Sequence, residues 1–146
     1  MNISKSDDAC LRQLCRNGTV EDVQSFVEQL RSVDALADSL ARKRGVFGYT
    51  PLHEAVASGN HEVLDYLLTT TSSAHVNSRA DSGYTCLHLA ASRGHIPCLR
   101  VLLKNGADIS ITDDFGKTPK QTAEISCKGD AVRILGSEAK LDSKSE

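Results

Sequence analysis

Gly48-Tyr49-Thr50-Pro51-Leu52-His53-Glu54-Ala55-Val56-Ala57-Ser58-Gly59-Asn60 returns 35 residues later as Gly83-Tyr84-Thr85-Cys86-Leu87-His88-Leu89-Ala90-Ala91-Ser92-Arg93-Gly94-His95. A third, weaker copy begins at Gly116-Lys117-Thr118-Pro119, 33 residues after the second. Self-similarity at this period is the signature of a solenoid made of stacked structural units. Such a stack offers an extended surface for recognition, so we expect a surface rather than an enclosed pocket to carry the function.

Each copy of the repeated stretch is predicted to begin a pair of helices. In the second copy Thr85 is placed to act as an N-cap, whose hydroxyl accepts a backbone N–H of the first turn. Gly94 then ends the first helix, because glycine tolerates the left-handed backbone conformation. Apolar residues recur at helical spacing from Ile96 to Leu103, which predicts a second helix, and Gly106 closes the unit.

Two short antiparallel helices and a turn, opened by Thr-x-Leu-His, resemble the ankyrin repeat. The matching residues are Thr50-Pro51-Leu52-His53, Gly59, Leu67-Leu68, Thr85, Leu87-His88, Ala90-Ala91, Gly94-His95, Leu102-Leu103 and Gly106-Ala107-Asp108. The resemblance covers roughly residues 6–136. It implies an all-α solenoid of helix–turn–helix units in which the turns between units form β-hairpin finger loops. It also implies that the fingers and the first helices form a concave binding face.

We predict about four units, of which the outer two are degenerate. The ankyrin-repeat domain is placed at 1–137, with a cap repeat at about 6–30, an insertion at about 31–45, repeats at 46–77 and 78–110, and a cap repeat at 111–136. In the last unit Gln121 replaces the histidine and Cys127 replaces the closing glycine. Residues 137–146 are polar and rich in small side chains, so we predict a disordered tail there.

Composition narrows the class of protein. The chain has 146 residues and a formal net charge of −2, without the basic excess typical of nucleic-acid-binding domains. It contains no apolar run near the ~18 residues of a membrane span, and its start lacks the apolar stretch of a signal peptide. Five cysteines, an odd number without framework spacing, favour reduced thiols. We therefore expect an intracellular protein, cytoplasmic and/or nuclear, that binds neither nucleic acid nor membrane.

Residues capable of chemistry are few. His53 and His88 could be ligands or general bases, but in a unit of this kind their imidazoles are expected to bond to turn groups and bridge neighbouring repeats. Cys10 and Cys15 could share a helix face, which leaves a thiol or metal site as a minor alternative. The sequence contains no phosphate-binding loop, nucleophile elbow or paired-carboxylate motif. We expect no enzymatic activity, no cofactor, no metal and no small-molecule substrate.

Positions that change between the copies are the candidates for partner recognition. The resemblance implies that partners are contacted around each turn glycine and at the end of the first helix. Four of the six aromatic residues of the chain fall at these positions, where the core pattern does not require them. Such side chains are typical of interface hot spots. The predicted partner-binding residues are Phe47, Tyr49, Asp81, Ser82, Tyr84, Arg93, Asp114, Phe115 and Lys117.

The sequence thus predicts a protein–protein interaction module, acting as an adaptor, an inhibitor or an assembly subunit, that is monomeric when alone. Its protein partner is not specified by the sequence. Two alternatives stay open. Phe47 and Phe115 could pack against neighbouring fingers and staple the solenoid, or the chain could be a structural or targeting segment of a larger protein. The N-terminal Met and the short polar tail favour a whole small protein.

Overall fold

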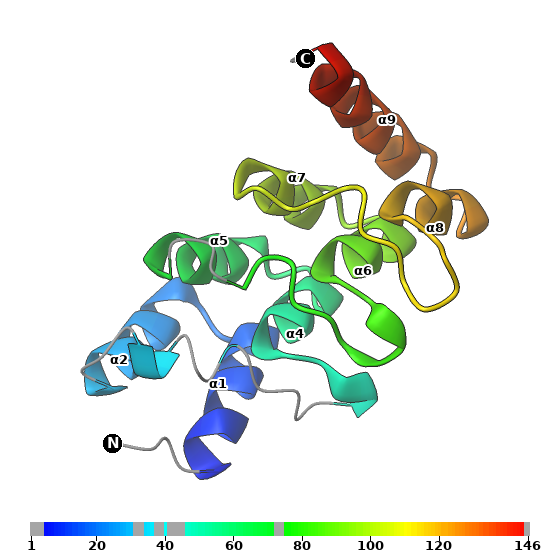
Figure 1. The fold of residues 1–146 in the computed structure, drawn as a ribbon. Coiled ribbons are helices and arrows are strands. Elements are labelled where there is room, and N and C mark those ends of the chain that lie inside the picture. Colours follow the sequence, from blue (N-terminus) through cyan, green and yellow to red (C-terminus); the bar gives the residue numbers. More distant parts are fainter. Residues whose placement is uncertain (1–4, 31–33, 37–39, 41–45, 72–74, 145–146) are drawn as a thin grey trace.

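A computed structural model describes residues 5–30, 34–36, 40, 46–71 and 75–144, and the path of the chain is shown in Figure 1. The named helices are α1 (Lys5–Asn17), α2 (Val20–Leu30), α4 (Pro51–Ala57), α5 (His61–Thr70), α6 (Cys86–Arg93), α7 (Ile96–Lys104), α8 (Pro119–Ile125) and α9 (Gly129–Lys144). They form two layers. Helices α1, α4, α6 and α8 stack in one layer, and α2, α5, α7 and α9 stack in the other (Figure 1).

The first helices of the units begin at threonine N-caps, as the sequence predicts. Thr50, Thr85 and Thr118 each accept the backbone N–H of the residue three positions later, at 3.3–3.4 Å. The turn that ends each of these helices needs a left-handed residue. Gly59 and Gly94 supply it with φ values of 73° and 68°. Because a glycine at this position has no Cβ to clash, it ends the helix without strain.

The core lies between the two layers and consists of aliphatic and small side chains. In the first layer Leu52, Ala55 and Val56 of α4 are fully buried, and so are Ala90 and Ala91 of α6. Alanines at these positions let neighbouring helices approach closely. The second layer contributes buried leucines, namely Leu64, Leu67 and Leu68 of α5 and Leu99 and Leu102 of α7.

Polar contacts of Arg16 and Asn60, both among the described residues, join the N-terminal unit to the next unit. The guanidinium of Arg16 donates through Nη2 to Oε2 of the buried Glu54 at 3.2 Å. The Asn60 side chain donates to the carbonyls of Cys15 and Gly18 at 3.2 and 3.0 Å, which satisfies backbone acceptors at the end of α1. These contacts replace the Thr-x-Leu-His motif that the first unit lacks.

The predicted insertion at 31–45 lies mostly outside the described residues. Within it, Leu36 and Leu40 are fully buried and belong to the core. This stretch therefore contributes to the packing of the N-terminal half.

The last helix overlaps the segment that the sequence analysis assigns to a tail. Helix α9 continues to Lys144, beyond the boundary placed at residue 137. The stretch 137–144 contains the strong helix formers Glu, Ala, Lys and Leu and no proline, so the helix that begins at Gly129 has no stop signal there.

The described residues at the tips of the loops form tight turns, with left-handed residues at 47–48, 82–83 and 116. Within the described residues no β-strand is formed, and Arg79 and Thr85 make an isolated antiparallel bridge in the second loop. Within the same residues, no helix is both long and apolar enough to cross a membrane. We call residues 46–50, 79–85 and 112–118 the first, second and third finger. The three fingers line up along one side of the first-helix layer (Figure 1).

Candidate functional site

The three fingers enclose a groove of about 320 Å³. It is lined by Phe47, Tyr49, Asp81, Ser82, Tyr84, Asp113 and Phe115. Six of these seven residues are among the predicted partner-binding residues, and the seventh, Asp113, is not in that predicted set. Side chains spread over 69 residues of sequence, from Phe47 to Phe115, thus converge on one surface feature.

The aromatic side chains at the finger tips are turned to solvent. Phe47 is 68% exposed and Phe115 is 77% exposed. Phe47 contacts Tyr49, with ring centroids 5.8 Å apart and ring planes inclined by 56°. Because most of both phenylalanine surfaces stays in water, stapling of neighbouring fingers does not account for them. Exposed aromatic side chains that gather in one groove are the usual mark of an interaction surface.

The backbone of the first finger holds Phe47 in an unfavourable conformation. Phe47 and Gly48 have φ values of 61° and 68°, and Ser82 and Gly83 of the second finger have 62° and 71°. Two consecutive left-handed residues form a type I′ turn, which glycine and asparagine normally occupy. A bulky side chain there costs about 1–2 kcal/mol. In Phe47 this cost is not offset by burial of the ring.

The third finger is shaped by Asp113. Its Oδ1 accepts the backbone N–H groups of Phe115 and Lys117, both at 2.9 Å. Gly116 is the left-handed residue of this turn, with φ 75°. The carboxylate of Asp113 is therefore fixed at the groove by two hydrogen bonds, and the ring of Phe115 is carried at the tip of the same turn.

Where neighbouring fingers meet, an aspartate of one finger packs against a glycine of the finger before it. A Cβ added at Gly48 would clash with Oδ1 of Asp81, and one added at Gly83 would lie 2.7 Å from Oδ1 of Asp114. The backbone N–H of Asp114 also donates to the Ser82 carbonyl at 2.9 Å. Asp81 and Asp114, predicted as partner contacts, thus have a first role in spacing the fingers.

The two tyrosines of the groove rest on histidines. The Tyr49 ring stacks on His53 at 5.4 Å with an interplanar angle of 11°, and the Tyr84 ring lies 5.2 Å from His88 at 32°. Sequence analysis assigned the histidines to the repeat scaffold and missed this second contact. The signal was present, since each tyrosine precedes its histidine by four residues.

The histidines in turn are fixed by hydrogen bonds that join consecutive units, as predicted. In His53, Nδ1 lies 2.8 Å from Thr50 Oγ1, and Nε2 lies 2.8 Å from the Tyr84 carbonyl oxygen. In His88 the corresponding partners are Thr85 Oγ1 at 2.7 Å and the Lys117 carbonyl oxygen at 2.8 Å. A carbonyl only accepts, so Nε2 carries the proton and donates in both rings. The walls of the groove are therefore held in place before any partner binds.

The charged side chains in the lining of the groove are acidic. Burial raises the pKa of Tyr84; the nearby Tyr49 and Asp113 raise it further, while a hydrogen bond with Ser92 and the charge of Arg93 lower it. The lining contains two carboxylates and no basic side chain. Across the described part of the chain, no cation forms an ion pair with Asp81 or Asp113.

The remaining predicted residues do not line the groove. Arg93 is exposed and donates through Nη1 to the Ala57 carbonyl at 3.4 Å, across to the preceding unit. Lys117 is exposed, and its backbone carbonyl is the acceptor for His88. Asp114 packs on Gly83. These three residues are close to the groove in sequence but serve contacts between units.

The cysteines are poorly suited to the alternative of a thiol or metal site. Cys15 is buried and Cys10 is exposed, so the two side chains do not face one another. Burial and the neighbouring Glu54 raise the pKa of Cys15, and burial raises the pKa of Cys98 to about 11. The reactive thiolate is thereby disfavoured. Among the described residues, no three His, Cys, Asp or Glu side chains are grouped so that they could hold a metal ion.

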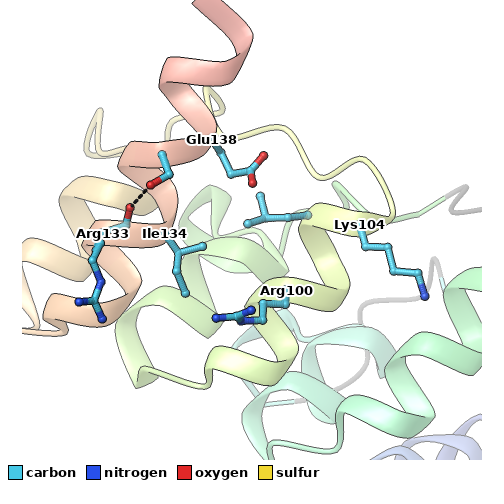
Figure 2. Close-up of a pocket in the computed structure, with 7 residues that line it drawn as sticks. Arg100, Lys104, Arg133, Ile134 and Glu138 are labelled. Atoms are coloured by element: carbon cyan, nitrogen blue, oxygen red, sulfur yellow. Dashed lines mark hydrogen bonds between the residues drawn. The ribbon is translucent and has the colours of Figure 1, made fainter.

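A second groove, of about 600 Å³, lies between α7 and α9 and is shown in Figure 2. Its lining consists of Arg100, Leu103, Lys104, Arg133, Ile134, Ser137 and Glu138. Sequence analysis did not find it, because residues at its end were assigned to the tail. Lys104 lies 3.5 Å from Asp65 and Arg133 pairs with Asp130, so two of its three cations already have acidic partners.

The chain is a helical-repeat recognition module. It consists of stacked pairs of short helices, in which threonines cap the first helices and histidines donate hydrogen bonds to the next finger. The family model described as "Ankyrin repeats (3 copies)" matches residues 9–113 and 72–145. The chain belongs to the ankyrin-repeat family.

Several relatives have names that describe regulatory proteins. The chain is 36% identical over 94 residues to NF-kappa-B inhibitor cactus of Drosophila yakuba, a match that covers 61% of this chain and 19% of that protein. It is 34% identical over 121 residues to protein phosphatase 1 regulatory subunit 27 of Mus musculus, covering 82% of this chain and 71% of that protein. A match to diacylglycerol kinase zeta of Rattus norvegicus spans only 8% of that enzyme. The chain thus spans a fifth or less of some of the relatives it matches.

Proposed function

We propose that this chain is a non-enzymatic protein-binding module that takes its partner on the concave face, at the groove between the three fingers. The observation that carries this proposal is the convergence of Phe47, Tyr49, Tyr84 and Phe115 in one groove, with both phenylalanines largely in water. Tyr49 and Tyr84 pack against the edge of the core, whereas Phe47 and Phe115 are exposed and are not part of it. A partner that covered them would remove a large apolar area from water, at about 25 cal/mol per Å².

The proposed mechanism is binding to a preformed surface. The fingers are held by Asp81 on Gly48 and Asp114 on Gly83, and the tyrosines are held by the two histidines. A partner therefore has few groups to order on the receptor side, and less of the interaction energy is spent on ordering.

The relatives support the class of function. One relative is named as an inhibitor of NF-kappa-B and another as a regulatory subunit of protein phosphatase 1. By analogy we propose that this chain acts as an adaptor, inhibitor or assembly subunit, is monomeric when alone and needs no cofactor. All five cysteines are free thiols, which agrees with an intracellular site of action, in the cytoplasm and/or the nucleus.

A selection followed by mapping tests the proposal. A display library of protein fragments is selected on the immobilised chain, and enriched fragments are titrated into the ¹⁵N-labelled chain while amide shifts are recorded by NMR. We expect the largest shifts in the three fingers, at residues 46–50, 79–85 and 112–118. Shifts confined to the α7–α9 groove or to the N-terminal unit would refute the assignment of the site.

A further inference from the structure

The finger groove combines aromatic walls with two carboxylates in its lining. Its lining has four aromatic side chains and the carboxylates of Asp81 and Asp113. The face of an aromatic ring attracts a cation through its quadrupole, and the attraction grows when both groups leave water. A carboxylate adds a charged hydrogen-bond acceptor. Both features favour the binding of a cationic group.

We propose that the groove receives a cationic side chain, the guanidinium of an arginine or the ammonium of a lysine, from an exposed segment of the protein partner. This inference rests on the proposed function, and it specifies the chemistry of the partner segment. The cation lies against the rings of the groove and the carboxylates contact its N–H groups, while the hydrocarbon stem of the side chain covers the phenylalanines.

The size of the groove fits one long side chain. A volume of about 320 Å³ is at the lower end of the range for ligand pockets, which begins at about 300 Å³. The rings of Phe47 and Tyr49 are inclined by 56°, so they form a corner rather than a flat wall. Tyr49 and Tyr84 cannot easily turn away, because each packs on a histidine that is bonded to the next finger.

The carboxylates are fixed where a cation would meet them. Oδ1 of Asp113 is held by two backbone N–H groups, and Asp81 packs on Gly48. Burial is the main cause of the raised pKa of Tyr84; Asp113 adds to it, and the charge of Arg93 opposes it. An acidic segment would be repelled here. A neutral apolar segment would cover the carboxylates without pairing them, and such burial is costly.

The first test uses the smallest matched pair of probes. N-acetyl-arginine amide and N-acetyl-citrulline amide have nearly the same shape and differ in charge. Each is titrated into the ¹⁵N-labelled chain. We expect saturable amide shifts in the fingers with the arginine probe and at least ~5-fold weaker binding with the citrulline probe. Equal responses to the two probes, or no response to either, would overturn the inference.

The second test uses the enriched protein fragments. Replacing their arginines and lysines one at a time by citrulline and acetyl-lysine should identify one anchor whose loss weakens binding at least ~10-fold. Asp81→Asn, which keeps the shape of the side chain, should reduce the effect of that replacement. Phe47→Leu, which keeps apolar area but removes a ring face, should weaken the arginine-bearing fragment more than its citrulline form.

The outcomes separate this inference from the proposed function. Fragments that map to the fingers but lack a basic anchor would overturn the cation inference and leave the proposed function standing. Fragments that bind elsewhere would overturn both. Loss of binding in Asp81→Asn together with a lowered melting temperature would point to finger packing instead, and circular dichroism of the variant detects it.

Discussion

At the residue scale, His88 contributes both to the stack of units and to the groove. Its Nδ1 lies 2.7 Å from Thr85 Oγ1, its Nε2 donates to the Lys117 carbonyl at 2.8 Å, and its ring supports Tyr84. One buried side chain thus fixes a helix start, the next finger and a wall of the groove. Gln121 holds the same position in the last unit, where its Oε1 accepts the Thr118 N–H at 2.9 Å.

Replacing His88 should change both the stability and its dependence on pH. His88→Ala leaves the Lys117 carbonyl and the Thr85 N–H without their partners, so we expect the free energy of unfolding to fall by about 1–3 kcal/mol. His88→Gln keeps an acceptor for the helix cap and should cost less. Urea denaturation at pH 7 measures both variants.

The pH dependence follows from the pKa of His88, which burial lowers below its ordinary value of 6.5. Between the two pKa values the unfolded chain binds more protons than the folded chain, so the contribution of His88 to stability is complete above about pH 6.5 and falls as the pH is lowered. The stability difference between the wild type and His88→Gln should therefore shrink from pH 7 to pH 5. A difference that stays constant or grows toward acid would contradict this account.

Cys127 follows the first helix of the last unit, at the position that Gly59 and Gly94 occupy in the two preceding units. Its φ is 58°, in the left-handed region that favours glycine. Cys127→Gly removes the backbone strain but adds freedom to the unfolded chain, so we expect a net gain of about 0.5 kcal/mol in the free energy of unfolding. The matched reverse variant, Gly94→Ala, should lose about 1 kcal/mol. Chemical denaturation of both variants measures these changes in the free energy of unfolding. A destabilised Cys127→Gly would mean that the thiol side chain makes a contact worth more than the strain.

At the scale of the elements, the contact between α1 and α4 depends on a charged pair. Glu54 is buried on α4, and Arg16 of α1 is its partner at 3.2 Å with half of its side chain in water. We expect Arg16→Met to lower the free energy of unfolding by about 1 kcal/mol, because it leaves a buried carboxylate unpaired. The double variant Arg16→Met/Glu54→Leu should be less damaged than the sum of the two single variants. Strict additivity in the double-mutant cycle would show that the pair does not couple the helices.

The repeat motif was enough to predict the elements in the middle of the chain. Thr50 and Thr85 mark helix starts, and Gly59 and Gly94 mark helix ends, because capping is a local property of a few residues. The extent of α9 was not predictable in this way, since its last turns show neither a cap nor an apolar face that sets them apart from a polar tail. Helix formation there depends on continuation from Gly129.

The candidate site was partly predictable for the same reason. Repetition identifies the variable positions, and this led to Phe47, Tyr49, Tyr84 and Phe115. It does not reveal distances between fingers, so the place of Asp113 in the groove and the packing of Asp81 on Gly48 appeared only in the structure. Arg93 and Lys117 follow the same pattern of variable positions but contact neighbouring units instead.

At the scale of the whole molecule, the stacking of the units determines the geometry of the exposed aromatic groove. Each of the two central units donates a histidine N–H to the next finger, so the spacing of the fingers is set by the stack and not by the loops alone. Residues from three fingers can then form one groove without contacts between distant helices. A change that loosened the stack would be expected to impair binding even far from the groove.

The central claim is that the exposed phenylalanines serve binding and not folding. The most direct measurement compares Phe47→Ala/Phe115→Ala with Ile125→Ala, since Ile125 is a similarly exposed apolar residue (67%) outside the groove. Calorimetric titration with a fragment from the display selection gives the affinity, and urea denaturation gives the stability. We expect both proteins to keep the wild-type free energy of unfolding within about 0.5 kcal/mol. Only the double phenylalanine variant should bind more weakly, by at least ~30-fold, the equivalent of about 2 kcal/mol. Unchanged affinity in the double variant, or a loss of stability that matches the loss of binding, would contradict the account.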